Sequence, residues 1–146
     1  MGSMFRTADA AGVEKVYLVG VTPEPCDRYG RPNEKLLKVA LGAEKAVAWE
    51  HAKSASRLID TLKKDGFAIW ALEQAKGAKP LFGAKPKKFS KIALVVGNEI
   101  KGLSRAILKR AERIVQIPMY GEKESLNVAV AFGIAVYQLR VKMEKR

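Results

Sequence analysis

Hydrophobic and polar positions along this chain follow two periods. Short apolar runs rich in β-branched residues, bounded by Gly or Pro, predict strands at 13–21, 46–50, 67–73, 91–97 and 113–119. Apolar residues at helical spacing predict helices at 6–12, 54–66, 103–112 and 125–143. Among the strands, "KIALVVG" at 91–97 is expected to be the most clearly buried.

Alternating helices and strands predict an α/β fold, with a parallel sheet flanked by helices in one domain spanning 1–146. The segment 22–45 is expected to be a long loop or to contain a short helix. Ligands of parallel sheets lie beyond the carboxyl ends of the strands. This rule points to Gly20, Glu73, 97–99 and 117–119.

The net charge of the chain says more about its function than its length does. Lys and Arg number 27 against 15 acidic residues, a formal net charge of +12. Such a surface suits a phosphate polymer, and we favour nucleic acid over charge that serves solubility alone. Cys26 is the one cysteine, so no internal disulfide can form, and a reducing compartment fits.

Several classes of function lose support from the sequence. No apolar run reaches the length of a membrane span, and the first residues do not resemble a secretory signal, so we expect a cytoplasmic protein. His51 is the one histidine and has no partner cysteine, so we expect no metal site and no Ser-His-Asp triad.

The run "VVGNEIKGLS" follows a predicted strand and carries Gly97, Glu99 and Gly102. Glycines let backbone amides approach a ligand closely, and Glu99 at a strand exit can accept hydrogen bonds from a ribose or an amine. The run matches neither a dinucleotide-binding nor a Walker A loop. An ordinary strand-to-helix turn is the alternative.

A second polar run, "IPMYGEKESLN", leads into the last predicted helix. Ser125 is expected to be the N-cap and Asn127 to lie in the first helical turn. Free amides at this helix start, beside a hydroxyl and an amide side chain, would suit polar ligand groups. Simple capping by Ser125 is the alternative.

Three pieces of the chain together resemble a known family. The segments "FRTADAAGVEKVYLVGVTPEP", "ALVVGNEIKGLS" and "IVQIPMYGEKESLNVAVAFGIAVYQLR" occur in the order of the three motifs of the SpoU-type (TrmH-like) RNA 2'-O-ribose methyltransferases, in the SPOUT class. The segment "ALGAEKAVAWE" also resembles that family. The resemblance covers nearly the whole chain, and the ordered triple is specific although each motif alone is loose.

The resemblance implies a C-terminal deep trefoil knot, bound S-adenosylmethionine and a homodimer acting on RNA, with tRNA favoured over rRNA. The matching cofactor positions are Gly97, Ile117, Met119 and Leu126, with Leu72 or its neighbour Glu73 expected nearby. The matching catalytic positions are Arg6, Glu99, Ser125 and Asn127. The chain departs from the family at its start: by register, the asparagine ahead of the motif-one arginine would fall just before Met1, so either the start lies too late or the protein lacks this asparagine and the leading strand.

The chemistry of methyl transfer to a hydroxyl assigns Arg6 a role. Transfer is an in-line displacement that depends on geometry and on loss of the hydroxyl proton. Because guanidinium groups hold their proton, we expect Arg6 to bind the adjacent phosphate and stabilise the developing alkoxide, rather than to act as a base. Glu99, Ser125 and Asn127 would orient it and the ribose.

Two other functions remain open. The missing asparagine favours a catalytically impaired knotted dimer that acts as an RNA-binding module, while the four catalytic matches oppose it. A nucleotide-binding enzyme of doubly wound type would need a Gly-rich phosphate loop after the first strand, and "VGVTPEP" is not one.

Overall fold

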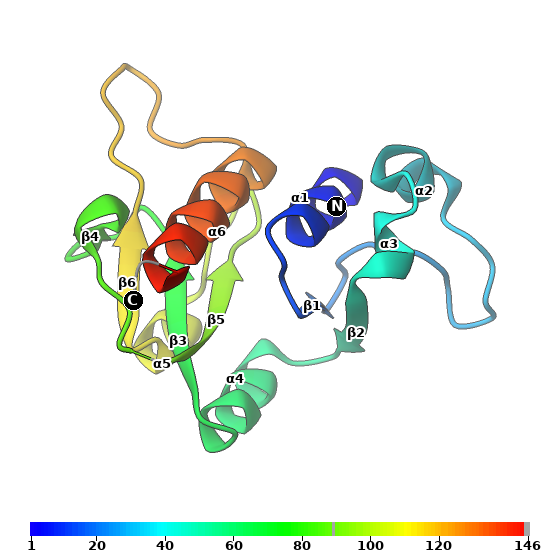
Figure 1. The fold of residues 1–146 in the computed structure, drawn as a ribbon, viewed down its shortest axis with the longest axis horizontal. Helices are drawn as coiled ribbons and strands as arrows, with labels where there is room; N and C mark the ends of the chain where they lie inside the picture. Colours follow the sequence, from blue (N-terminus) through cyan, green and yellow to red (C-terminus); the bar gives the residue numbers. More distant parts are fainter. Residues whose placement is uncertain (89, 145–146) are drawn as a thin grey trace. The chain divides into compact units, whose positions relative to one another are not determined.

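The computed structural model describes residues 1–88 and 90–144 (Figure 1). The chain divides into two compact units, Met1–Ala55 and Ser56–Arg146. Every pairing between the named strands of the described residues is parallel, which confirms the predicted α/β class. The single domain over 1–146 and the trefoil knot stay predictions.

The N-terminal unit contains a parallel pair of strands and three helices. Its elements are α1 (Gly2–Ala10), β1 (Lys15–Val19), α2 (Glu34–Ala40), α3 (Ala43–Ala46) and β2 (Ala48–Ala52). Helix α1 begins four residues earlier than the pattern predicted. It ends near Gly12, whose φ of 68° is the left-handed conformation that terminates helices.

Close packing of α1 on α2 forms the centre of this unit. A Cβ added at Gly2 would lie 2.6 Å from the carbonyl oxygen of Leu36, so only glycine permits this approach. Phe5 of α1 and Leu18 of β1 are completely buried. The predicted loop 22–45 contains two helices rather than at most one, separated by Leu41 and Gly42 in the left-handed conformation.

The C-terminal unit contains a four-stranded parallel sheet in the order β4-β6-β3-β5. Its helices are α4 (Ala55–Lys64), which starts on the last residue of the N-terminal unit, η1 (Leu81–Gly83), α5 (Arg105–Arg110) and α6 (Val128–Glu144). Its strands are β3 (Phe67–Leu72), β4 (Lys79–Pro80), β5 (Lys91–Val96) and β6 (Arg113–Gln116). Strand β4 has two residues and was not predicted.

Helix α6 packs against this sheet and closes its core (Figure 1). Side chains from the two inner strands meet α6 and η1 in one apolar cluster: Trp70, Leu72, Leu81, Ala84, Val115, Ile117, Ala135 and Leu139. Strand β3 is the most buried strand. The expectation that 91–97 would be the most buried was wrong, because β5 lies at the sheet edge and is only half-buried.

The start of α6 corrects a second expectation. The helix begins at Val128, and Asn127 rather than Ser125 is its N-cap. The Asn127 side-chain oxygen accepts hydrogen bonds from the backbone N–H of Ala129 at 2.9 Å and of Val130 at 3.4 Å. Asparagine satisfies free amides at a helix start as well as serine does. In the described part of the chain, no helix is long and apolar enough to cross a membrane.

Candidate functional site

A cavity of about 500 Å³ opens in the C-terminal unit, where β3, β5 and β6 end. This volume lies in the range of small-molecule sites. The cavity brings together six predicted site residues: Leu72, Gly97, Glu99, Ile117, Ser125 and Leu126. Parallel strands present their carboxyl ends at one edge, which explains why positions far apart in sequence meet here.

A tight turn after β5 forms one wall of the cavity. The Asn98 side-chain oxygen accepts a hydrogen bond from the Ile100 N–H at 2.8 Å, and the Asn98 carbonyl accepts one from the Gly102 N–H at 2.8 Å. A Cβ at Gly97 would lie 2.6 Å from the Gly102 carbonyl carbon. Only glycine at position 97 fits this turn, which places bare backbone at the cavity surface.

Glu73 fastens this turn to the end of β3. Its carboxylate accepts hydrogen bonds from the Leu103 N–H at 2.7 Å and the Gln74 N–H at 2.9 Å. The Gln74 side chain donates to the Ile117 carbonyl at 2.7 Å. The exits of three strands are thus tied together. Glu73 was expected at this strand exit; Gln74 was not, although its position next to a strand end was the available signal.

Glu99 and Asn127 join the second and third motifs directly. The Asn127 amide nitrogen donates to the Glu99 carboxylate at 3.1 Å. The Asn127 side-chain oxygen accepts a hydrogen bond from an amide at the start of α6, and this contact directs the side-chain nitrogen toward Glu99. Asn127 itself does not line the cavity, but it orients a carboxylate that does.

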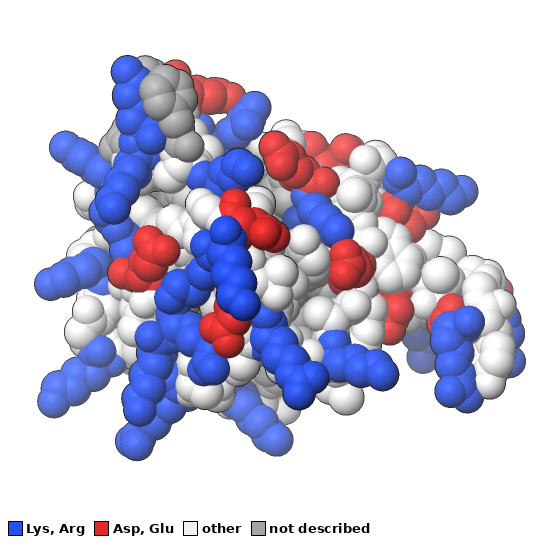
Figure 2. Space-filling model, turned by 90° about the horizontal axis from the view of Figure 1, so that it is seen from below, with Lys and Arg blue, Asp and Glu red and all other residues white. Residues whose placement is uncertain are grey.

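The cavity is acidic although the protein is basic. Three carboxylates line it, from Glu73, Glu99 and Glu124, against one cationic lining side chain, Lys101. Lys and Arg side chains are spread widely over the face drawn in Figure 2. We name this site the acidic cavity. Local charge of this sign attracts a cationic ligand and disfavours a phosphate group.

Three other predicted residues lie outside the acidic cavity lining. Met119 is half-buried beyond the end of β6, and Asn127 contacts the cavity through Glu99. Arg6 is exposed on α1 in the N-terminal unit. The grouping of Arg6 with Glu99, Ser125 and Asn127 stays a prediction.

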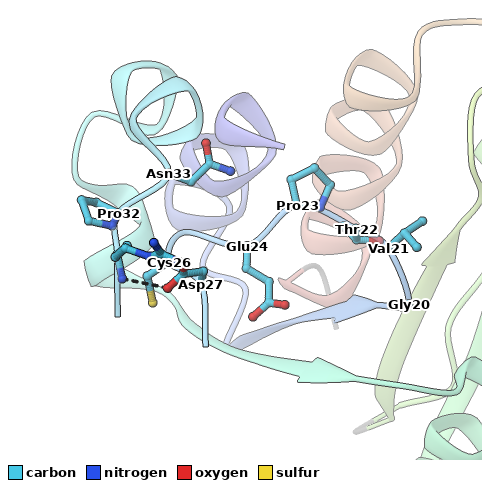
Figure 3. Close-up of a pocket in the computed structure, with 10 residues that line it drawn as sticks. Gly20, Val21, Thr22, Pro23, Glu24, Cys26, Asp27, Pro32 and Asn33 are labelled. Carbon is cyan, nitrogen blue, oxygen red and sulfur yellow. Dashed lines mark hydrogen bonds and ion pairs between the residues drawn. The ribbon is translucent and has the colours of Figure 1, made fainter. Parts of the chain in front are cut away.

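The N-terminal unit has a cavity of its own, of about 380 Å³, formed by residues of the segment 20–33 (Figure 3). It includes Gly20, which the strand-exit rule pointed to, but none of the residues matched to the family's cofactor and catalytic positions. His51 lies at its edge, with Nε2 2.8 Å from the Gly20 carbonyl oxygen, and thus ties β2 to the end of β1. This contact gives His51 a structural role.

Comparison with known proteins identifies the family. The sequence model described as "SpoU rRNA Methylase family" matches residues 1–137. The chain belongs to this family. The prediction from the three ordered motifs is therefore confirmed.

Three relatives illustrate the likeness. A 23S rRNA (guanosine(2553)-2'-O)-methyltransferase, RlmP of Bacillus subtilis, is 36% identical over 140 residues, which are 96% of this chain and 52% of that protein. The A. aeolicus TrmH/SpoU tRNA modifying enzyme is 31% identical, with a TM-score of 0.82 over 99% of this chain and 68% of its own. An AdoMet-bound rRNA methyltransferase from Sinorhizobium meliloti is 28% identical, with a TM-score of 0.85 over 96% of this chain and 50% of its own.

The chain spans about half the length of the RlmP relative, 52% of that protein. The alignment therefore covers about half of RlmP, and the other half of RlmP lies outside it. Family membership establishes the fold of residues 1–137, and the residues of the acidic cavity are the basis for proposing an activity and a substrate.

Proposed function

We propose that this protein transfers the methyl group of S-adenosylmethionine to a ribose 2'-hydroxyl of RNA, with its two units acting as one methyltransferase domain. The observation that carries the proposal is the acidic cavity, where the family's second and third motifs meet through the Glu99–Asn127 hydrogen bond. The AdoMet-bound relative and the 2'-O-methyltransferase relative support the cofactor and the reaction.

The residues of the acidic cavity fit S-adenosylmethionine. That cofactor carries a sulfonium and an ammonium group, and the carboxylates of Glu73, Glu99 and Glu124 supply the opposite charge. Leu72, Ile117 and Leu126 offer apolar surface to its adenosine part. Glycine at position 97 keeps the backbone open to close approach. When bound, the cofactor supplies an electrophilic methyl group.

The protein's own contribution to the reaction is positioning and charge. Arg6 binds the phosphate beside the acceptor ribose and stabilises negative charge that develops on the 2'-oxygen. Glu99, held by Asn127, and the Ser125 hydroxyl orient the ribose at the cavity mouth. Holding reactants in line accounts for much of the barrier reduction in such displacements.

A homodimer is part of this proposal. Helix α6 is apolar on more than the side that faces the core, and four of its large side chains are 41–52% exposed: Val130, Tyr137, Val141 and Met143. Of the small residues of this helix, Ala129 and Gly133 lie outside the core cluster and permit close helix contact. We expect light scattering to give twice the chain mass, and Tyr137→Glu with Val141→Glu to give monomers. A monomeric unaltered protein would contradict the dimer.

Tritium-labelled S-adenosylmethionine tests the proposed function. The protein is incubated with unmodified 23S rRNA transcript and, separately, with unmodified tRNA, and label in 2'-O-methylated nucleotides is counted. We expect label in one of the two RNAs, with tRNA our preferred substrate. RNA binding without label in either would support the catalytically impaired RNA-binding module instead. Failure to bind S-adenosylmethionine would remove the proposal altogether.

A further inference from the structure

The loop 27–31 of the N-terminal unit presents an aromatic ring between two arginines. The Tyr29 side chain is 66% exposed, with the Arg28 and Arg31 guanidinium carbons 4.7 and 5.1 Å from the ring centroid. We name this segment the Arg-Tyr loop. None of the family's matching positions falls on it.

The Arg-Tyr loop is ordered by Asp27 and its own backbone, not by Tyr29. The Asp27 carboxylate accepts hydrogen bonds from the N–H of Tyr29 at 2.8 Å, the N–H of Arg31 at 3.0 Å and the Arg31 Nε at 2.7 Å. Gly30, with a φ of 76°, allows the chain to turn. An antiparallel β-bridge between the backbones of Cys26 and Pro32 closes the base of the loop. The exposed ring is therefore held out by a fixed frame that does not need it.

A ring in this setting has the chemistry of a single-strand RNA subsite. Unpaired bases stack on aromatic side chains and on guanidinium planes, and neighbouring phosphates bind arginine. A base can displace a guanidinium from the ring because an exposed cation–π contact is weak. The displaced Arg28 guanidinium then reaches a phosphate, while Arg31 keeps its Asp27 contact and offers its terminal N–H groups.

We propose that the Arg-Tyr loop binds an unpaired nucleotide of the RNA substrate, with its base on the Tyr29 ring and its phosphates on Arg28 and Arg31. This inference rests on the proposed function for the identity of the polymer, since it names a contact to the RNA that is methylated. The site recognises a base face and phosphates, without reading a particular base.

Two strands of equal charge test the stacking. The probes are a labelled single strand of about 15 adenosines, within the site sizes of single-strand binding proteins, and an abasic ribose-phosphate strand of the same length. The unaltered protein should bind the adenosine strand about tenfold more tightly. Tyr29→Leu should remove this preference and leave abasic binding unchanged, while the matched Tyr29→Phe, which keeps the ring, should retain it. Tyr29→Leu binding both strands as the unaltered protein does would overturn the proposal.

Two further measurements keep the test independent of folding and of methyl transfer. A strand containing 4-thiouridine should cross-link to the Tyr29 peptide of the unaltered protein; cross-links confined to other peptides would overturn the proposal. Arg28→Gln should reduce the slope of log affinity against log salt by about 0.7, one phosphate contact, and an unchanged slope would count against the phosphate contact. No cofactor is present, so failure of methylation leaves these outcomes standing, and their failure leaves methylation standing.

Discussion

The acidic cavity and the Arg-Tyr loop differ in the sign of their charge and in how they are built. The cavity gathers carboxylates from segments that follow three strands, and contacts between distant positions such as Glu99 and Asn127 hold these segments together. The loop gathers two arginines and a tyrosine within five residues, fixed by one local carboxylate, Asp27. A net charge of +12 predicts a polyanionic partner and conceals the acidic cavity. The positive charge of the whole chain suits RNA as a partner, whereas the negative charge of the acidic cavity suits a cationic cofactor.

Truncation of core side chains should have the largest effect. It tests whether the acidic cavity and the Arg-Tyr loop belong to units that unfold separately. Ile69 of β3 and Leu18 of β1 are both completely buried, so Ile69→Ala and Leu18→Ala should each cost about 2–5 kcal/mol of unfolding free energy in their own unit. Hydrogen exchange with mass spectrometry should show faster exchange mainly in Ser56–Arg146 for Ile69→Ala and mainly in Met1–Ala55 for Leu18→Ala.

Val21→Ala is the matched control, because Val21 is fully exposed and its truncation should change exchange in neither unit. If either core substitution accelerated hydrogen exchange equally in both units, the chain would unfold as one body. The two units would then not differ in stability.

Arg6 sharpens the comparison because it is the one cation of the N-terminal unit to which the proposed reaction assigns a chemical role. Arg6→Ala should lower methyl transfer by about 10²–10³-fold, the usual loss for one charge-stabilising donor. Arg6→Lys should retain part of the activity, since it keeps the charge. Both variants should bind S-adenosylmethionine normally by calorimetry. A lysine variant as inactive as the alanine variant would contradict an electrostatic role.

Gly97 tests the acidic cavity with a smaller change. A Cβ there would lie 2.6 Å from the Gly102 carbonyl carbon and 2.8 Å from the Leu103 nitrogen, so Gly97→Ala must displace the turn. We expect S-adenosylmethionine to bind about tenfold more weakly, a loss of about 1.4 kcal/mol by calorimetry. Gly83→Ala is the control, since its Cβ would meet nothing within 4 Å. Unchanged affinity in Gly97→Ala would place the cofactor elsewhere.

The smallest expected effect concerns the frame of the Arg-Tyr loop. The backbone N–H of Arg31 is the main cause that lowers the pKa of Asp27 from its ordinary 3.8, with help from the Tyr29 N–H and the Arg31 side chain. A lowered folded-state pKa stabilises the protein above the unfolded value, and this contribution is lost as pH falls through the folded value. The Arg31 amide signal in NMR should therefore titrate with a midpoint below 3.8 and stop titrating in Asp27→Asn. A midpoint at or above 3.8 would contradict the frame.

Strand positions were predictable because their signal is local. Apolar runs bounded by glycine marked β3, β5 and β6 to within a few residues, and the parallel arrangement followed from the helices between them. Convergence of Leu72, Gly97 and Ile117 then followed from the common edge of parallel strands. The ordered motifs added the family, which periodicity alone does not contain.

Other features depended on geometry that the sequence does not display. Ser125 and Asn127 are both good N-caps, and the structure selects Asn127 because its side chain reaches the first free amides of α6. An apolar run does not distinguish an edge strand from a central one, hence the error on 91–97. The two residues of β4 are too few to show any period.

Amide chemical shifts can show whether the cofactor and the RNA bind at separate sites, because they locate two ligands in one protein. We expect S-adenosylmethionine to shift amides around the acidic cavity, at 72–75, 96–103 and 116–131, and to leave the Arg-Tyr loop unchanged. A single strand of adenosines should shift the amides of 27–31. Cofactor-induced shifts centred on 27–31, with the cavity amides unmoved, would contradict the account.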